Sequence, residues 1–151
     1  MENALDTLYK TYKVKEYLIK DYKYWTWSIR PAQCTLGASI VCMKRLVPSF
    51  SDTTKEEMAE LAVVGKDVER ALKKTFSYQK INWMALMMVD PQVHFHIVPR
   101  YPTRKEFAGA AWEDPGWPKL AVLAGQNKPT GSDDTNPELV RQITSAVKAN
   151  L

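Results

Sequence analysis

Both histidines of the chain, His94 and His96, stand two residues apart with apolar residues between and around them. Side chains in a β-strand alternate between its two faces, so a period of two predicts a strand here. Gln92, His94 and His96 are expected on one face, and the alternate positions form an apolar face. Pro91 and Pro99 are expected to bound this strand, because proline cannot donate to an interior ladder.

Three roles are open to this pair of imidazoles. They can be satisfied polar residues beside a core, or two ligands of a metal ion with Asp90 or another carboxylate completing the set. The third role is nucleophilic catalysis on phosphorus, because a neutral imidazole is a good nucleophile at physiological pH. That role needs an acceptor for the other ring nitrogen and a donor for the phosphoryl oxygens. Two imidazoles on one face can share a phosphate, and the amide of Gln92 is expected beside them.

The bulk properties favour a single globular domain that binds a phosphate-bearing ligand. The chain has 151 residues, and 21 Lys and Arg against 17 Asp and Glu give a net charge of +4. This charge is too small for a protein that coats nucleic acid. Cys34 and Cys42 lack metal-binding spacing and are expected to be buried, reduced thiols. No signal peptide and no membrane-spanning run are evident, so a cytoplasmic protein is expected.

Periodicity places several elements before the histidines. Helical spacing of apolar residues predicts a helix over residues 3–20. Two runs with a period of two, 22–29 and 35–43, predict an antiparallel hairpin. A long amphipathic helix is predicted over 54–76, starting with a capping box that pairs either Thr53 with Glu56 or Thr54 with Glu57.

The remaining elements follow the same reasoning. Residues 81–86 are apolar on both faces, which predicts a central strand antiparallel to the histidine strand. Residues 101–118 hold two tryptophans, three prolines and two glycines without clear period, which indicates an ordered loop. Asn136 as N-cap and Pro137 at the first helical position predict a final helix over about 137–150.

The histidine stretch resembles the signature of the histidine-triad (HIT) family, His-φ-His-φ-His-φ-φ, in which φ is apolar. The Pro99-Arg100 that follows resembles the Pro-Arg often found in its dinucleoside polyphosphate hydrolase branch. The segment from Arg30-Pro31 to Val41 looks like the second strand of the family. The predicted long helix and Asn82 also lie where the family has its long helix and a strand asparagine. The resemblance covers residues 24–101.

The resemblance implies an α+β fold with an antiparallel sheet of about five strands, a long packed helix and a C-terminal helix. Residues 1–151 would form one HIT-like domain, with a core at 24–101 and a C-terminal extension at 102–151. The family commonly dimerises, so a homodimer is expected. A nucleotide is the expected small-molecule partner, and neither a membrane nor a nucleic acid is expected as one.

The implied activity is hydrolysis at an α-phosphate of a diadenosine polyphosphate or a nucleoside phosphoramidate. His94 would be the nucleophile that forms a nucleotidyl-histidine, and His96 would contact the phosphate or the leaving group. Gln92 would support them from the position of the first histidine. The residues expected to bind substrate are Asn82, Trp27, Arg30 and Arg100. No cofactor is implied, and a divalent metal would serve only as a counter-ion of the substrate. The alternative is a nucleotide-binding or interaction protein of the same fold with little catalysis.

Four departures from the family pattern concern the substrate pocket. Gln92 replaces the first histidine, and Met87-Met88 stand where relatives often have glycine with a polar residue. Ala38 stands where the second strand often carries a histidine. Arg30 lies near the place of a ribose-binding polar residue. These departures predict a retained nucleophile in an altered pocket.

Overall fold

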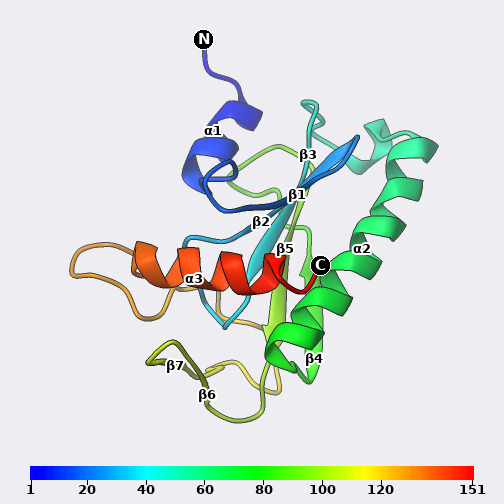
Figure 1. The fold of residues 1–151 in the computed structure, drawn as a ribbon. Helices are drawn as coiled ribbons and strands as arrows, with labels where there is room; N and C mark the ends of the chain where they lie inside the picture. The colour runs from blue at the N-terminus through cyan, green and yellow to red at the C-terminus, as the bar shows by residue number, and fades with distance from the viewer.

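The computed structural model describes all 151 residues, and its centre is a five-stranded antiparallel sheet with the order β1-β2-β3-β5-β4 (Figure 1). The α+β architecture, the β2–β3 hairpin and the antiparallel pairing of β4 with β5 agree with the prediction. The strands are β1 (Leu18–Asp21), β2 (Trp25–Ile29), β3 (Ser39–Met43), β4 (Lys80–Met84) and β5 (His94–Arg100).

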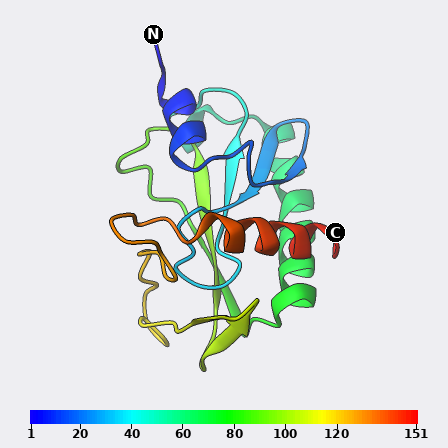
Figure 2. The same cartoon turned by 60° about the vertical axis from the view of Figure 1, so that its left-hand side comes forward.

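Two helices, α2 (Lys55–Phe76) and α3 (Pro137–Lys148), cover one face of the sheet (Figure 2). Their apolar stripes meet the odd-numbered residues of β2 and β5 in one core, which includes Trp25, Trp27 and Ile97. This core buries the apolar face that the sequence predicts for the histidine strand. The histidines therefore face away from both helices.

The helix starts follow local sequence rules. Thr54 caps α2: its hydroxyl accepts from the Glu57 amide at 3.2 Å, and the Glu57 carboxylate accepts from the Thr54 amide at 2.8 Å. The second of the two predicted capping registers is therefore the one formed. Asn136 caps α3 by accepting from the Glu138 amide at 3.0 Å, with Pro137 in the first turn, as predicted.

The histidine face has a thinner cover made of two separate segments. At one end, Leu8 of α1 (Ala4–Thr11) and the following Val14 pack on Ile40 and Cys42 of β3. At the other end, residues 119–124 approach Val98 of β5. The histidines lie between these two covers, which leaves room for a cavity.

The predicted helix over residues 3–20 is too long. Helix α1 ends at Thr11, and Lys13 takes a left-handed conformation with φ 48°, which a helix cannot continue. The chain then forms β1, whose Ile19 belongs to the main core. Strand β1 has only four residues and lies among lysines, so the sequence shows no clear period of two there.

The position of one strand and the boundaries of two others differ from the prediction. Strand β4 is an edge strand rather than a central one, and its half-buried residues are sheltered by α2. Strand β3 begins at Ser39, because Gly37 (φ 91°) turns the chain just before it. Strand β5 begins at His94 and runs through Pro99, which is tolerated because the β3 ladder ends at Ile97.

The segment predicted as a loop after Arg100 contains a hairpin of β6 (Lys105–Phe107) and β7 (Ala110–Trp112). Ala108 and Gly109 both have positive φ, as a two-residue hairpin turn requires. Between β3 and α2 lies a 3-10 turn, η1 (Phe50–Asp52). None of the helices is both long and apolar enough to cross a membrane.

Candidate active site

A cavity of about 160 Å³ opens on the histidine face of the sheet. Strand β5 forms its floor, and the loop between β4 and β5 forms one wall. The other walls come from the end of α1, the residue after β2 and the segment before residue 124. The lining residues are Tyr12, Arg30, Leu86, Met87, Met88, Val89, Asp90, His94, His96 and Leu123.

His94 is held in one tautomer by its own strand. It is 2% exposed, and its Nδ1 lies 2.6 Å from the main-chain carbonyl oxygen of Gln92. A carbonyl oxygen can only accept, so Nδ1 carries the proton and Nε2 keeps its lone pair. No protein group bonds Nε2, and His94 lines the cavity. His94 thus presents an unpaired ring nitrogen to the cavity while an acceptor holds the other ring nitrogen, as nucleophilic catalysis requires.

His96 lies edge-on to His94, with ring centroids 5.0 Å apart and planes at 82°. Its Nδ1 is buried without a partner. A bare lone pair is tolerated better in that setting than an unpaired N–H, which favours the proton on Nε2. Burial, with the nearby charge of Arg30, lowers the pKa of His96 to about 3. At neutral pH His96 is therefore an uncharged ring that can donate a hydrogen bond.

The depressed pKa of His96 predicts acid lability of the fold. The unfolded chain binds a proton near pH 6.5 and the folded chain only near pH 3, so stability is full above 6.5 and falls as pH drops through this window. Between pH 7 and pH 5 the His96 contribution to the unfolding free energy should fall by about 2 kcal/mol. Urea unfolding at the two pH values measures it, and His96→Gln should show a smaller fall. An equal fall in both proteins would contradict the assignment.

Arg30 is the only cation that lines the cavity. It is 6% exposed, and its Nη1 donates to Cys34 Sγ and to the Leu123 carbonyl, each at 3.5 Å. Its Nε is buried without a partner, and it forms no ion pair. The structure therefore places Arg30 where substrate binding was predicted, beside the histidines.

Tyr12 was not predicted as a site residue, yet it covers both histidines. Its ring centroid lies 5.6 Å from that of His96 and 6.3 Å from that of His94. The Arg30 guanidinium lies 5.9 Å from the same ring. Tyr12 follows α1, more than 80 residues before the histidine strand, and no local pattern in the sequence indicates that contact.

The Gln92 side chain contacts neither imidazole through a hydrogen bond. Gln92 lies just before β5, and its amide bonds the segment after β3 instead. Its Nε2 donates to the carbonyls of Met43 at 3.0 Å and Arg45 at 2.8 Å, and its Oε1 accepts from the Val47 amide at 2.8 Å. Gln92 therefore acts on the site only through its backbone carbonyl, which holds His94.

Arg100 and Asn82 lie on the histidine face but outside the cavity lining. Arg100 forms a two-pronged ion pair with Asp114, with distances of 2.5 and 3.0 Å, and donates to Asn82 Oδ1 at 2.8 Å. These contacts use the groups that were expected to bind substrate. In the structure, Arg100 and Asn82 hold the loop that contains Asp114 against the sheet.

Trp27 is on the wrong face of the sheet for the predicted contact with the base. It is fully buried in the core beneath α2 and α3, whereas the histidines face the other way. The period-two pattern of β2 predicts this placement, because Trp25, Trp27 and Ile29 share one face.

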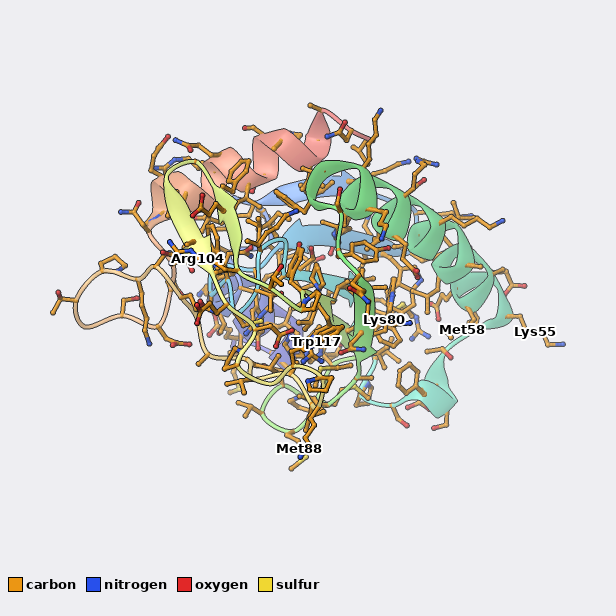
Figure 3. All side chains as sticks on the ribbon, turned by 90° about the horizontal axis from the view of Figure 1, so that it is seen from below. Lys55, Met58, Lys80, Met88, Arg104 and Trp117 are labelled. Carbon is orange, nitrogen blue, oxygen red and sulfur yellow. The ribbon has the colours of Figure 1, made fainter.

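The loop before β5 is apolar and projects outwards. Met88 and Val89 are 86% and 89% exposed, and Met88 points away from the sheet at the loop tip (Figure 3). Met87 takes a left-handed conformation with φ 45°. No group of three or more His, Cys, Asp or Glu side chains is placed to hold a metal ion. Cys34 and Cys42 are buried and unpaired.

Comparisons with known proteins agree with this geometry. A family model of the HIT domain matches residues 34–103, which include β3, α2, β4 and β5. A histidine triad protein from Sinorhizobium meliloti superposes with a TM-score of 0.65 at 21% identity, covering 92% of this chain and 93% of that one. One from Bradyrhizobium japonicum gives 0.62 at 23% identity, covering 91% and 93%. The chain has the HIT fold.

Another HIT-fold structure, a hypothetical histidine triad nucleotide-binding protein from Sulfolobus tokodaii, gives a TM-score of 0.63 at 15% identity, covering 93% of this chain and 90% of that one. The domain match covers 70 of the 151 residues, and these neighbours share the fold of the chain. No curated protein sequence matches it. At such identities the HIT fold is shared, while the cavity residues of this chain must be judged from their own geometry.

Proposed function

We propose that the protein is a nucleotide hydrolase that acts at an α-phosphate through a nucleotidyl-histidine on His94. The observation that carries the proposal is the 2.6 Å contact between His94 Nδ1 and the Gln92 carbonyl, which leaves Nε2 as a free lone pair at the cavity. HIT proteins are typically nucleotide hydrolases or transferases, and the family match extends over this strand.

The roles of the other cavity residues follow from their chemistry. Arg30 supplies a permanent positive charge for phosphate oxygens, which suits a site whose neighbouring loop, Met87-Met88, has no polar side chain. His96, uncharged, donates a hydrogen bond to a phosphoryl or leaving-group oxygen. Tyr12 limits the cavity on the side of the α1 helix. Water then attacks phosphorus, and the nucleotide leaves His94.

Turnover and trapping test this function together. The purified protein should release AMP from at least one of a panel of adenylyl compounds, and rapid quenching in alkaline denaturant, in which a histidine P–N bond survives, should yield protein heavier by one adenylyl group. Peptide mapping should place that group on His94. Inactivity toward the whole panel would overturn the proposal.

A binding protein with little catalysis is the second candidate, and the size of the cavity favours it. A volume of about 160 Å³ is below the range of roughly 300–1,000 Å³ that is usual for ligand pockets. Only the phosphate end of a nucleotide would be enclosed. Calorimetry with AMP and the panel assay together distinguish the candidates, because this one predicts AMP binding that His94→Asn leaves unchanged and no release of AMP from any compound of the panel.

We also propose that the active form is a homodimer joined along the outer edge of β4. One side of this strand has no partner in the sheet, and Trp83 lies half-buried there with its Nε1 unpaired. A shallow groove beside it is lined by Met58, Leu61, Ala62, Gly65, Glu69 and Trp83. Sedimentation velocity should give about twice 17.3 kDa, and Trp83→Arg should reduce it to one chain. A single-chain mass at every concentration would contradict this assembly.

A further inference from the structure

Arg30 differs from the other buried arginine in having no counter-ion. Arg100 is neutralised by Asp114 through two hydrogen bonds and also donates to Asn82. Arg30 is buried to a similar degree, but it has two long contacts to neutral acceptors, and its Nε bonds nothing. A buried guanidinium is costly unless an anion completes its hydrogen bonds. The cavity is thus lined by a buried positive charge that no anion of the protein neutralises.

The position of Arg30 identifies which part of a substrate can supply the neutralising negative charge. The guanidinium is stacked near Tyr12, whose ring lies closer to His96 than to His94. The charge of Arg30 also acts directly on His96. Asp90 is the only carboxylate that lines the cavity, and it forms no ion pair with Arg30. The positive charge therefore lies on the His96 side of the nucleophile.

The chemistry of the first step depends on the leaving group. The lone pair of His94 Nε2 forms a bond to phosphorus, and the bond from phosphorus to the leaving group breaks with its electron pair. A phosphate oxygen carries that pair as an anion without taking a proton. An amine nitrogen must gain a proton as it leaves, because its anion is far too basic. His96, with a pKa of about 3, is not an imidazolium at neutral pH, and the N–H of an uncharged imidazole donates a hydrogen bond but is far too weak an acid to give up that proton.

We propose that Arg30 stabilises the charge that develops on the leaving group, so that the site prefers nucleotidyl donors that release a phosphate anion over donors that release an amine. This inference rests on the proposed function and narrows its substrate class. Water completes the reaction: its oxygen bonds to phosphorus, the bond to His94 Nε2 breaks, and the water protons pass to the products and solvent. The ring returns to its neutral form.

Two substrates with the same adenylyl group and different leaving groups test the proposal. Diadenosine tetraphosphate releases a phosphate anion, and adenosine 5′-phosphoramidate releases ammonia. The wild-type kcat/KM should be higher for the tetraphosphate. Arg30→Gln should lower that value about 100-fold, in line with the loss of one charged group that stabilises a transition state, and should change the phosphoramidate value less than about threefold. The kcat/KM of Arg30→Lys for the tetraphosphate should lie between that of the wild type and that of Arg30→Gln.

The controls separate charge from folding. Arg104→Gln removes one positive charge from an exposed, hairpin-flanking position and should leave both values unchanged. If Arg30→Gln does not fold, Arg30→Lys with competitive inhibition by tripolyphosphate replaces it, and weaker inhibition than in wild type is expected. Equal losses of kcat/KM on both substrates, or no loss on either, would overturn the role of Arg30 and leave the proposed function standing. Wild-type inactivity on both would overturn the proposed function as well.

Discussion

Replacing His94 with alanine is expected to lower the turnover of adenylyl substrates by at least about 10³-fold, the scale seen when a nucleophile is deleted. The variant loses the free Nε2 lone pair, and the lone pair of the other imidazole in the lining, His96, lies on its buried Nδ1. The adenylyl-protein species should disappear as well. Steady-state assays and mass spectrometry after an alkaline quench measure the two effects.

The interpretation of His94→Ala requires a folded variant with an intact cavity. Its thermal unfolding should remain cooperative, because removing His94 breaks one side-chain hydrogen bond, to the Gln92 carbonyl. His96→Asn is the matched comparison, since it alters the neighbouring imidazole and keeps the nucleophile. It should lose less activity and should still form the adenylyl-protein. Turnover by His94→Ala within tenfold of wild type would exclude His94 as the nucleophile.

Replacing Asp114 with alanine is expected to lower the unfolding free energy by about 3–5 kcal/mol, because it leaves the buried Arg100 charge unpaired. The two side chains are 5% and 1% exposed, so solvent does not screen the pair. Urea unfolding followed by fluorescence measures the change.

Two variants determine whether an unpaired charge is the cause. Glu106→Ala removes the partner of Arg104 from an exposed pair and should cost less than about 1 kcal/mol. The double variant Arg100→Met/Asp114→Leu removes both charges and should be more stable than Asp114→Ala. A double variant as unstable as Asp114→Ala would point to lost packing instead of an unpaired charge.

The parts of this protein that were predictable from sequence depend on local patterns. The period of two at His94 and His96 defines a strand and its faces, and the capping box at Thr54 marks the start of α2. These features involve residues within a few positions of one another. The family resemblance, which covers the same region, added the expectation of one antiparallel sheet of about five strands, which local patterns do not supply.

The side-chain partners across the site were not predictable, because they join distant parts of the chain. Gln92 has the spacing of a residue on the histidine face, but three backbone groups of the segment 43–47 satisfy its amide elsewhere. Arg100 follows the motif as a phosphate ligand would, but Asp114 neutralises it. Tyr12 reaches the histidines only because α1 folds onto that face. Period and spacing carry no information about such tertiary contacts.

The separation of the two sheet faces also determines what the tryptophans of this protein can report. Trp25, Trp27 and Trp112 are buried in the helix-covered core, and none of the five tryptophans lines the cavity. Intrinsic fluorescence will therefore follow unfolding closely and remain nearly silent when a nucleotide enters. Spectroscopic titrations of the cavity will need a reporter introduced on the other face, and Tyr12→Trp, directly above the histidines, is the position the fold offers.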